Sequence, residues 1–244
     1  MNIRMILEYE GTRYNGWQRQ DSTDNTIQGK IEAILSKMCG VPVEIHGAGR
    51  TDSGVHAFGQ VLNFHMEEKK NPEEIMSYVN RYLPEDIAVI DCMEVSERFH
   101  SRLNAKGKIY QYRIWNTSKR NVFERRWTYA YEDKLDIEAM KEAASYMIGT
   151  HDFKSFCTKK KMKKSTVRTI TSIDIEKTGD EIKITYEGNG FLYHMVRIVT
   201  GTLMEVGNGK KKPTDIIRIL EQKDRSKAGP LVPAQGLSLL LVKY

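Results

Sequence analysis

The chain has 244 residues, of which 38 are Lys or Arg and 32 are Asp or Glu, so its formal net charge is +6. A folded chain of this length buries about 70% of its unfolded surface and needs no disulfide or metal to stabilise its core. The cysteines Cys39, Cys92 and Cys157 are odd in number and far apart, which argues against a disulfide framework and a zinc site. No apolar run approaches the ~20 residues that span a bilayer. We therefore expect a cytoplasmic protein without a metal or a membrane association.

The charge is unevenly distributed along the chain. Residues 1–105 hold 11 basic and 16 acidic residues, a net charge of −5, whereas residues 106–244 hold 27 and 16, a net charge of +11. Two lysine runs, 159–164 and 210–212, lie in the basic part. Either run alone is equally compatible with a solvated loop. Together they favour an anionic partner such as a nucleic acid.

In chain order, the hydrophobic pattern predicts two successive sets of strands and helices. Ile3, Met5, Leu7 and Tyr9 alternate with mostly polar neighbours, as in a half-buried strand, and Asn25 and Thr26 are both candidate N-caps of the helix that follows. The first set consists of strands at 3–9, 43–46, 60–66 and 87–95 and helices at 27–38 and 72–83. The second consists of strands at 108–115, 167–176, 181–186 and 237–242 and helices at 136–148, 191–206 and 214–222.

The first set has the order β-α-β-β-α-β, and the second is a longer version of it. This order is that of the ferredoxin-like split β-α-β motif. We therefore predict an α+β protein with two ferredoxin-like halves, residues 1–105 and 106–244. They would form one mostly antiparallel sheet with helices on one face. A cleft between the halves is the expected position of an active site.

The segment 46–59, HGAGRTDSGVHAFG, contains four glycines, one aspartate, one arginine and two histidines between two predicted strands. A simple turn, in which Asp52 bonds local N–H groups and Gly54 takes a positive φ, is the ordinary explanation of Asp-x-Gly. The segment is long for such a turn, however, and its glycines would let a bulky ligand approach the backbone. Motifs for ATP, dinucleotide, zinc-protease and serine-hydrolase chemistry are absent from the sequence. The scattered histidines, including His56 and His194, are expected to have structural roles.

Residues 49–57, GRTDSGVHA, resemble the signature loop of the TruA family of tRNA pseudouridine synthases. The resemblance continues through nearly the whole chain in the same order as in that family. Its further motifs are at 7–12, 16–18, 26–29, 99–102, 108–113, 149–153, 190–197 and 234–237.

The resemblance implies a cofactor-independent enzyme that converts uridine to pseudouridine at positions 38, 39 and 40 of the tRNA anticodon stem-loop. It implies that Asp52 is the catalytic nucleophile, that Tyr110 contacts the target base and that Arg197 pairs with the catalytic carboxylate. The family's members act as homodimers, and we carry that expectation over. Arg50, next to the catalytic loop, is expected to hold a phosphate or to fill the gap left by a flipped nucleotide.

The residue types suit these roles, although each has a simpler explanation. A carboxylate such as Asp52 is ionised at neutral pH and can form and release a bond to the substrate. Arg197 follows apolar helical residues, where an unpaired cation is costly unless its side chain extends to solvent. Tyr110 offers a stacking ring and a hydroxyl to a flipped base, but cross-strand packing alone would also explain it. Arg50 is equally compatible with pairing to Asp52 or another acid.

Two other functions fit parts of the sequence. A non-catalytic RNA-binding protein would explain the basic half, but an acid facing a polyanion would serve no purpose in it. A glycoside hydrolase would require a second carboxylate ~5 to 9.5 Å from the first, and the signature loop supplies only one.

Overall fold

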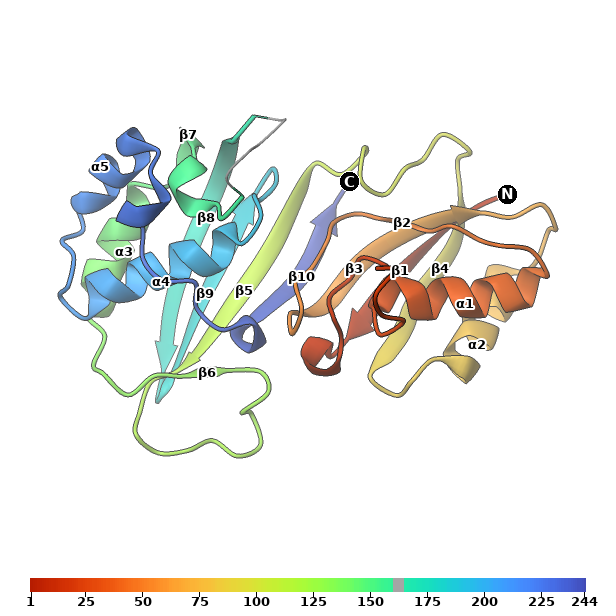
Figure 1. Cartoon of the computed structure of the whole chain (residues 1–244), viewed down its shortest axis with the longest axis horizontal. Helices are drawn as coiled ribbons and strands as arrows, with labels where there is room; N and C mark the ends of the chain where they lie inside the picture. The colour runs from red at the N-terminus through yellow and green to blue at the C-terminus, as the bar shows by residue number, and fades with distance from the viewer. Residues whose placement is uncertain (160–164) are drawn as a thin grey trace. The chain divides into compact units, whose positions relative to one another are not determined.

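The structure is a computed structural model that describes residues 1–159 and 165–244. The chain forms two compact units (Figure 1). The first unit comprises Met1–Lys106 and Ser238–Tyr244, and the second comprises Gly107–Leu237. The predicted second half, residues 106–244, therefore differs from the second unit, because the last seven residues pack with the first unit. Across the described ranges, no helix has the length and apolar character needed to cross a membrane.

The sheet of the first unit is built around β1 (Asn2–Tyr9). This strand pairs antiparallel with β3 (His56–His65) on one side and with β4 (Ile87–Val95) on the other. The short β2 (His46–Gly47) pairs antiparallel with β3, and β10 (Leu237–Lys243) pairs with β3 in the parallel direction. The parallel pair joins Ser238 and Leu239 to the first residues of β3 and explains why the end of the chain belongs to this unit.

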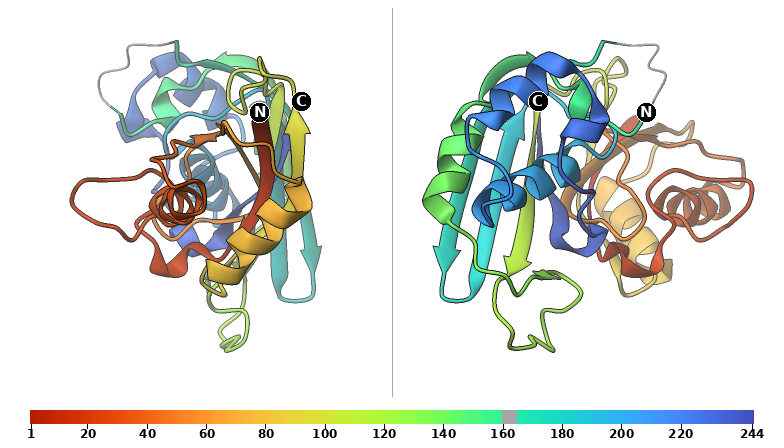
Figure 2. Two further views of the ribbon diagram at one scale, coloured as in Figure 1. Left: turned by 90° about the vertical axis from the view of Figure 1, so that its right-hand side faces the viewer. Right: turned by 60° about the vertical axis from the view of Figure 1, so that its left-hand side comes forward.

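Helices α1 (Ile27–Cys39) and α2 (Pro72–Tyr82) lie on one face of this sheet (Figures 1 and 2). Thr26 is the N-cap of α1, since its hydroxyl accepts a hydrogen bond from the Gly29 N–H at 3.2 Å. The helix ends at Gly40, whose φ of +71° is the left-handed conformation common after a helix. The alternating apolar residues of β1 are fully or almost fully buried beneath the helices, as the period of two predicts.

The second unit contains four antiparallel strands in the order β5, β9, β8, β7. Their bounds, with the short β6 that runs parallel to β5, are β5 (Gly107–Trp115), β6 (Tyr129–Ala130), β7 (Gly149–Asp152), β8 (Val167–Thr178) and β9 (Glu181–Gly188). Every second residue of β5 from Tyr110 to Ile114 is buried, so these side chains share one face of the sheet.

That face of β5 and β9 is covered by α4 (Met195–Gly207). The Tyr186 hydroxyl of β9 is hydrogen-bonded to Thr200 Oγ1 of α4 at 2.7 Å. The other helices of the unit are α3 (Ile137–Ser145), which packs on α4 and β8, and α5 (Asp215–Gln222). The described residues also form short 3₁₀ helices at Gly11–Arg13, Lys154–Phe156, Arg225–Lys227 and Ala234–Gly236.

The α+β class, the mostly antiparallel pairing and helices on one face are confirmed. Two strand predictions were wrong in their bounds. The predicted strand 43–46 is reduced to His46–Gly47, and the predicted strand 60–66 begins four residues earlier, at His56. His56 and Ala57 are buried, and the alternation rule does not detect a strand start that lies inside a glycine-rich motif. The predicted cleft between the halves stays a prediction.

Thr26→Ala should lower the free energy of unfolding by about 1 kcal/mol, because the Gly29 N–H loses its cap. Thr214→Ala is the matched control, since Thr214 occupies the N-cap of α5 without a side-chain hydrogen bond and is exposed. Urea denaturation measures both variants. Equal losses at the two positions would contradict the capping role of Thr26.

Candidate active site

Asp52 lies in the loop between β2 and β3 and is half-buried. The loop turns immediately after it, because the Val55 N–H donates to the Asp52 carbonyl at 3.1 Å. Gly54, the third residue of this turn, has a φ of +80°, which a side chain would disfavour. The local turn expected of Asp-x-Gly is therefore present, and it uses the backbone carbonyl of Asp52.

Hydrogen bonds from the last residue of β1 and from the segment after it fix the residues on both sides of Asp52. The Thr51 carbonyl accepts from the Trp17 N–H at 3.0 Å, and Thr51 Oγ1 bonds to the Tyr9 hydroxyl at 2.8 Å. On the other side, Ser53 Oγ donates to the Tyr14 carbonyl at 3.0 Å. Burial raises the pKa of the Tyr9 phenol above its usual range, so it remains a neutral hydrogen-bonding group. The backbone of Asp52 is thus held from two sides.

Two glycines allow this segment to approach the loop. Gly16 has a φ of +88°, and a Cβ there would lie 2.8 Å from the Thr51 carbonyl oxygen and 3.1 Å from the Asp52 carbonyl carbon. At Gly11 a Cβ would lie 2.0 Å from the Val55 carbonyl oxygen. Both glycines belong to the motifs at 7–12 and 16–18. The resemblance at these motifs therefore reflects residues that position the Asp52 loop.

His56 is a structural residue, as the sequence indicated. Its ring is fully buried, and its Nδ1 accepts a hydrogen bond from the Gly11 N–H at 3.1 Å. The neighbouring Gln60 is also fully buried and donates from Nε2 to the Gly49 carbonyl at 3.0 Å. Arg50, between these two anchored parts of the loop, is exposed. The structure therefore places Arg50 and Asp52 on one braced loop of the first unit.

Tyr110 lies on β5 in the second unit, opposite Tyr186 of β9. Its side chain is 8% exposed, and its ring meets Phe191 edge to face, with centroids 5.2 Å apart. Phe191 precedes α4 and belongs to the motif 190–197. Tyr110 therefore has the cross-strand partner that packing alone would explain, and its ring also contacts Phe191, which lies outside the sheet.

Arg197 lies in the first turn of α4 and is half-buried. Its Nε donates to the Val232 carbonyl at 2.8 Å. The next carbonyl, that of Pro233, accepts from the Tyr112 hydroxyl at 2.7 Å. Burial raises the pKa of Tyr112, and the positive charge of Arg197 opposes part of that rise. Arg197 and the strand that carries Tyr110 therefore meet around Tyr112 and the segment before β10.

The left-handed backbone conformation of His194 was not predicted from the sequence. This residue has a φ of +64°, a conformation that costs a residue with a side chain about 1–2 kcal/mol. Its Nδ1 is hydrogen-bonded to Thr158 Oγ1 at 2.8 Å, and its ring stacks on Tyr193 with centroids 3.7 Å apart. The strained residue sets the start of α4 at Met195 and hence the position of Arg197. Only the motif 190–197 signalled this region.

The structure places Arg50 and Asp52 on one loop of the first unit, and Tyr110 and Arg197 on β5 and α4 of the second unit. A single site formed by all four residues stays a prediction.

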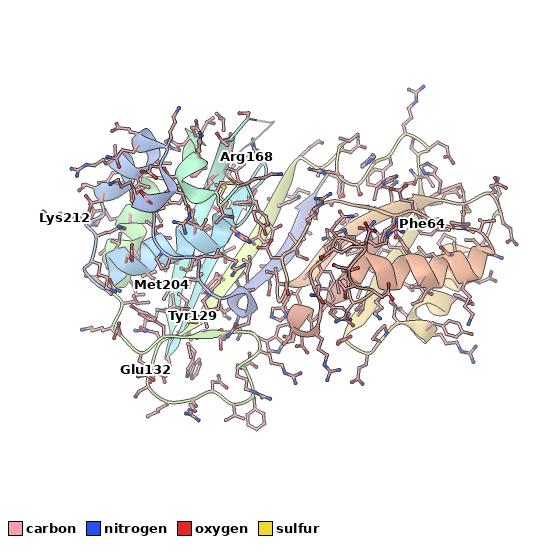
Figure 3. All side chains as sticks on the ribbon, in the orientation of Figure 1. Phe64, Tyr129, Glu132, Arg168, Met204 and Lys212 are labelled. Atoms are coloured by element: carbon pink, nitrogen blue, oxygen red, sulfur yellow. The ribbon has the colours of Figure 1, made fainter. Side chains whose placement is uncertain are left out.

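The two lysine runs of the sequence, 159–164 and 210–212, lie only partly within the residues that the structure describes. Lys159 is exposed, and 160–164 lie outside the described residues. In the second run, Lys211 pairs with Glu205 at 3.2 Å, which gives it a structural role. Lys210 and Lys212 are exposed, and Figure 3 marks Lys212 at the periphery of the unit.

A family model described as tRNA pseudouridine synthase matches residues 5–104 and 143–244. A tRNA pseudouridine synthase A from Bacillus sp. (strain KSM-64) is 49% identical over 98% of this chain and 97% of that protein. Two further relatives are similar to this chain: tRNA pseudouridine synthase A 1 of Clostridium tetani is 49% identical, and tRNA pseudouridine synthase A of Acetivibrio thermocellus is 45% identical. Both alignments cover 100% of this chain and 99% of the relative.

The structure thus combines an α+β fold with an aspartate on a braced glycine-rich loop. The chain belongs to the tRNA pseudouridine synthase family and is an isomerase of that family. The resemblance drawn from the motifs is thereby confirmed, and the reaction to be explained is tRNA pseudouridylation.

Gly16→Ala should reduce pseudouridine formation by about 10²-fold, because a Cβ at this position displaces the backbone of Thr51 and Asp52. Gly40→Ala is the matched control: Gly40 also has a positive φ, but nothing lies within 4 Å of its added Cβ. The control should lose only about 1–2 kcal/mol of stability and keep its activity. Turnover and urea denaturation measure the two effects, and comparable turnover in both variants would contradict the bracing role of Gly16.

Proposed function

We propose that the protein converts uridine to pseudouridine at positions 38, 39 and 40 of the tRNA anticodon stem-loop, with Asp52 as the nucleophile after the uridine has been flipped out. The observation that carries the proposal is the bracing of Asp52. Thr51 and Ser53 are hydrogen-bonded to the segment after β1, and Gly16 packs on the intervening backbone. The fixed backbone restricts where the Asp52 carboxylate can lie, and covalent catalysis requires a positioned nucleophile.

The reaction breaks the bond between N1 and C1′ and forms a bond between C5 and C1′. The uracil must rotate while it is detached, and the proton on C5 is lost as N1 gains one, so the product is an isomer of the substrate. A carboxylate can add to C6 of the base or to C1′ of the sugar and leave again in the last step. Both routes use Asp52 in its ionised form, and neither requires a cofactor.

Tyr110 and Phe191 support base flipping. A uridine within a stem is inaccessible until it leaves the stack, and a pocket for the extruded base needs an aromatic or apolar surface. The edge-to-face pair of Tyr110 and Phe191 provides such a surface, and it fixes the orientation of the Tyr110 ring. In the proposed complex, Tyr110 contacts the flipped uracil.

Arg197 and Arg50 supply positive charge. The bond from Arg197 Nε to Val232 orients the guanidinium, and a planar guanidinium can bind a carboxylate through two N–H groups. We assign the Arg197 guanidinium to Asp52. Arg50 is exposed beside Asp52 on the same loop, and we assign it to a phosphate next to the flipped nucleotide or to the gap that the nucleotide leaves.

In these assignments, both sequence halves contribute residues to catalysis and tRNA binding. Residues 1–105 supply Asp52 and Arg50, whereas residues 106–244 supply Tyr110, Arg197 and most of the positive charge that binds tRNA. The family resemblance adds the proposal of a homodimer that shares the tRNA, and the three scattered cysteines support a cytoplasmic location.

Asp52→Asn should reduce tritium release from tRNA labelled at C5 of uridine by at least about 10³-fold, because the amide is a poor nucleophile. tRNA binding, measured by filter retention, should remain within a few-fold of wild type. Asp21→Asn, a change at an exposed aspartate of the same unit, is the control and should keep full activity.

Full tritium release by Asp52→Asn would remove this residue from the mechanism. A wild-type protein that bound tRNA without any release would instead support the alternative of a non-catalytic RNA-binding protein.

A further inference from the structure

The loop that joins β5 to β6 exposes an aromatic side chain among cations. It spans Asn116–Thr128 and extends beyond the ends of β5, β8 and β9 (Figures 1 and 2). Phe123 at its tip is 90% exposed, the highest value among the exposed large hydrophobic residues of the described ranges. The neighbouring Val122 is 59% exposed. We call this segment the β5–β6 loop.

The base of the β5–β6 loop is firmly attached to the sheet. Arg113 of β5 donates from Nη2 to the Glu124 carboxylate at 2.8 Å, and Trp115 Nε1 donates to the Lys119 carbonyl at 2.8 Å. Asn116 Nδ2 donates to the Tyr131 carbonyl at 2.9 Å and so joins the two ends of the loop. These bonds limit the conformations that the tip can adopt.

The tip itself has a defined turn. The Glu124 N–H donates to Asn121 Oδ1 at 3.1 Å, and the Trp127 N–H donates to the Glu124 carbonyl at 2.9 Å. Phe123 is therefore held outward on an ordered turn. Leaving a Phe side chain in water forgoes about 1.5–3 kcal/mol of burial, and the ring forms an exposed apolar pair with the neighbouring Val122.

The charges of the loop identify the chemistry of that partner. The loop contains one acid, Glu124, which is paired with Arg113. Its cations, all exposed, are Lys119, Arg120, Arg125 and Arg126. A rigid exposed ring flanked by cations suits an unstacked base, with the ring on the base and the cations on its phosphates. A contact between this loop and the same loop of a second copy is disfavoured, because it would place four cations against four cations.

We propose that the β5–β6 loop is a second RNA subsite, at which Phe123 stacks on an unpaired nucleotide of the tRNA substrate other than the isomerised uridine. The inference rests on the proposed function for the identity of the RNA. The loop lies outside the segments that the family model matches, residues 5–104 and 143–244. The subsite fixes the register of the RNA and takes no part in the chemical step.

Equilibrium binding to two RNAs tests the subsite. One is an anticodon stem-loop hairpin, and the other is a blunt duplex with the same number of phosphates. Phe123→Ala should weaken hairpin binding about tenfold, which corresponds to about 1.4 kcal/mol, and leave duplex binding unchanged. Phe123→Trp should bind the hairpin within about twofold of wild type, because it retains a stacking ring.

Two control variants separate stacking from other effects. Ile217→Ala removes another exposed apolar side chain of the same unit and should leave both affinities unchanged. Arg120→Gln should lower the dependence of log K on log salt by about 0.9 for the hairpin, as expected for one lost phosphate contact. Because Phe123 is exposed, its variants should keep the wild-type free energy of unfolding.

Unchanged hairpin binding by Phe123→Ala would overturn the proposal, as would an equal loss with hairpin and duplex. Loss of a dimer in sedimentation of Phe123→Ala would assign the ring to a contact between copies of this chain and would also overturn it. Binding is measured without turnover. A wild type that binds the hairpin but releases no tritium would therefore contradict the proposed function, while the Phe123 comparison still decides the subsite.

Discussion

The arrangement of the candidate active site depends on one backbone contact, between Gly16 and the peptide that joins Thr51 to Asp52. This contact requires a glycine with a positive φ, since a Cβ would lie 2.8 Å from the Thr51 carbonyl oxygen. The hydrogen bond from the Trp17 N–H to that same carbonyl follows directly from it. A nucleophilic carboxylate loses effectiveness when its position varies, so this packing links the fold to the proposed chemistry.

In the second unit, backbone carbonyls fix an aromatic and a cationic side chain. Tyr112 and Arg197 donate to the successive carbonyls of Pro233 and Val232. The motif at 234–237 follows these residues, and at Gly236 a Cβ would lie 2.6 Å from the Tyr112 ring. Glycines and backbone carbonyls that take no part in the reaction therefore hold the site residues in position. These supporting residues are spread along the sequence, which explains why the motifs extend along nearly the whole chain.

Hydrophobic periodicity was sufficient to predict most of the fold, including β1, α1 and the pairing of long antiparallel strands. It failed at β2 and at the start of β3, where glycines and buried polar residues replace the alternating pattern. The Asp52 loop and Arg197 were found through motifs. Neither the positive φ of His194 nor the exposure of Phe123 was predictable, because both depend on contacts between residues that are distant in sequence. Phenylalanine is a common residue type in protein cores, so the identity of residue 123 alone does not indicate that it is exposed.

The central claim is that the braced carboxylate of Asp52 isomerises uridines on the 3′ side of the anticodon stem-loop. The most direct measurement is carbodiimide labelling and primer extension on a tRNA transcript that carries uridine at 38, 39 and 40. We predict pseudouridine stops at these positions alone after incubation with wild type, and none after incubation with Asp52→Asn. Stops elsewhere in the tRNA, or stops at these positions that persist with the variant, would contradict the account.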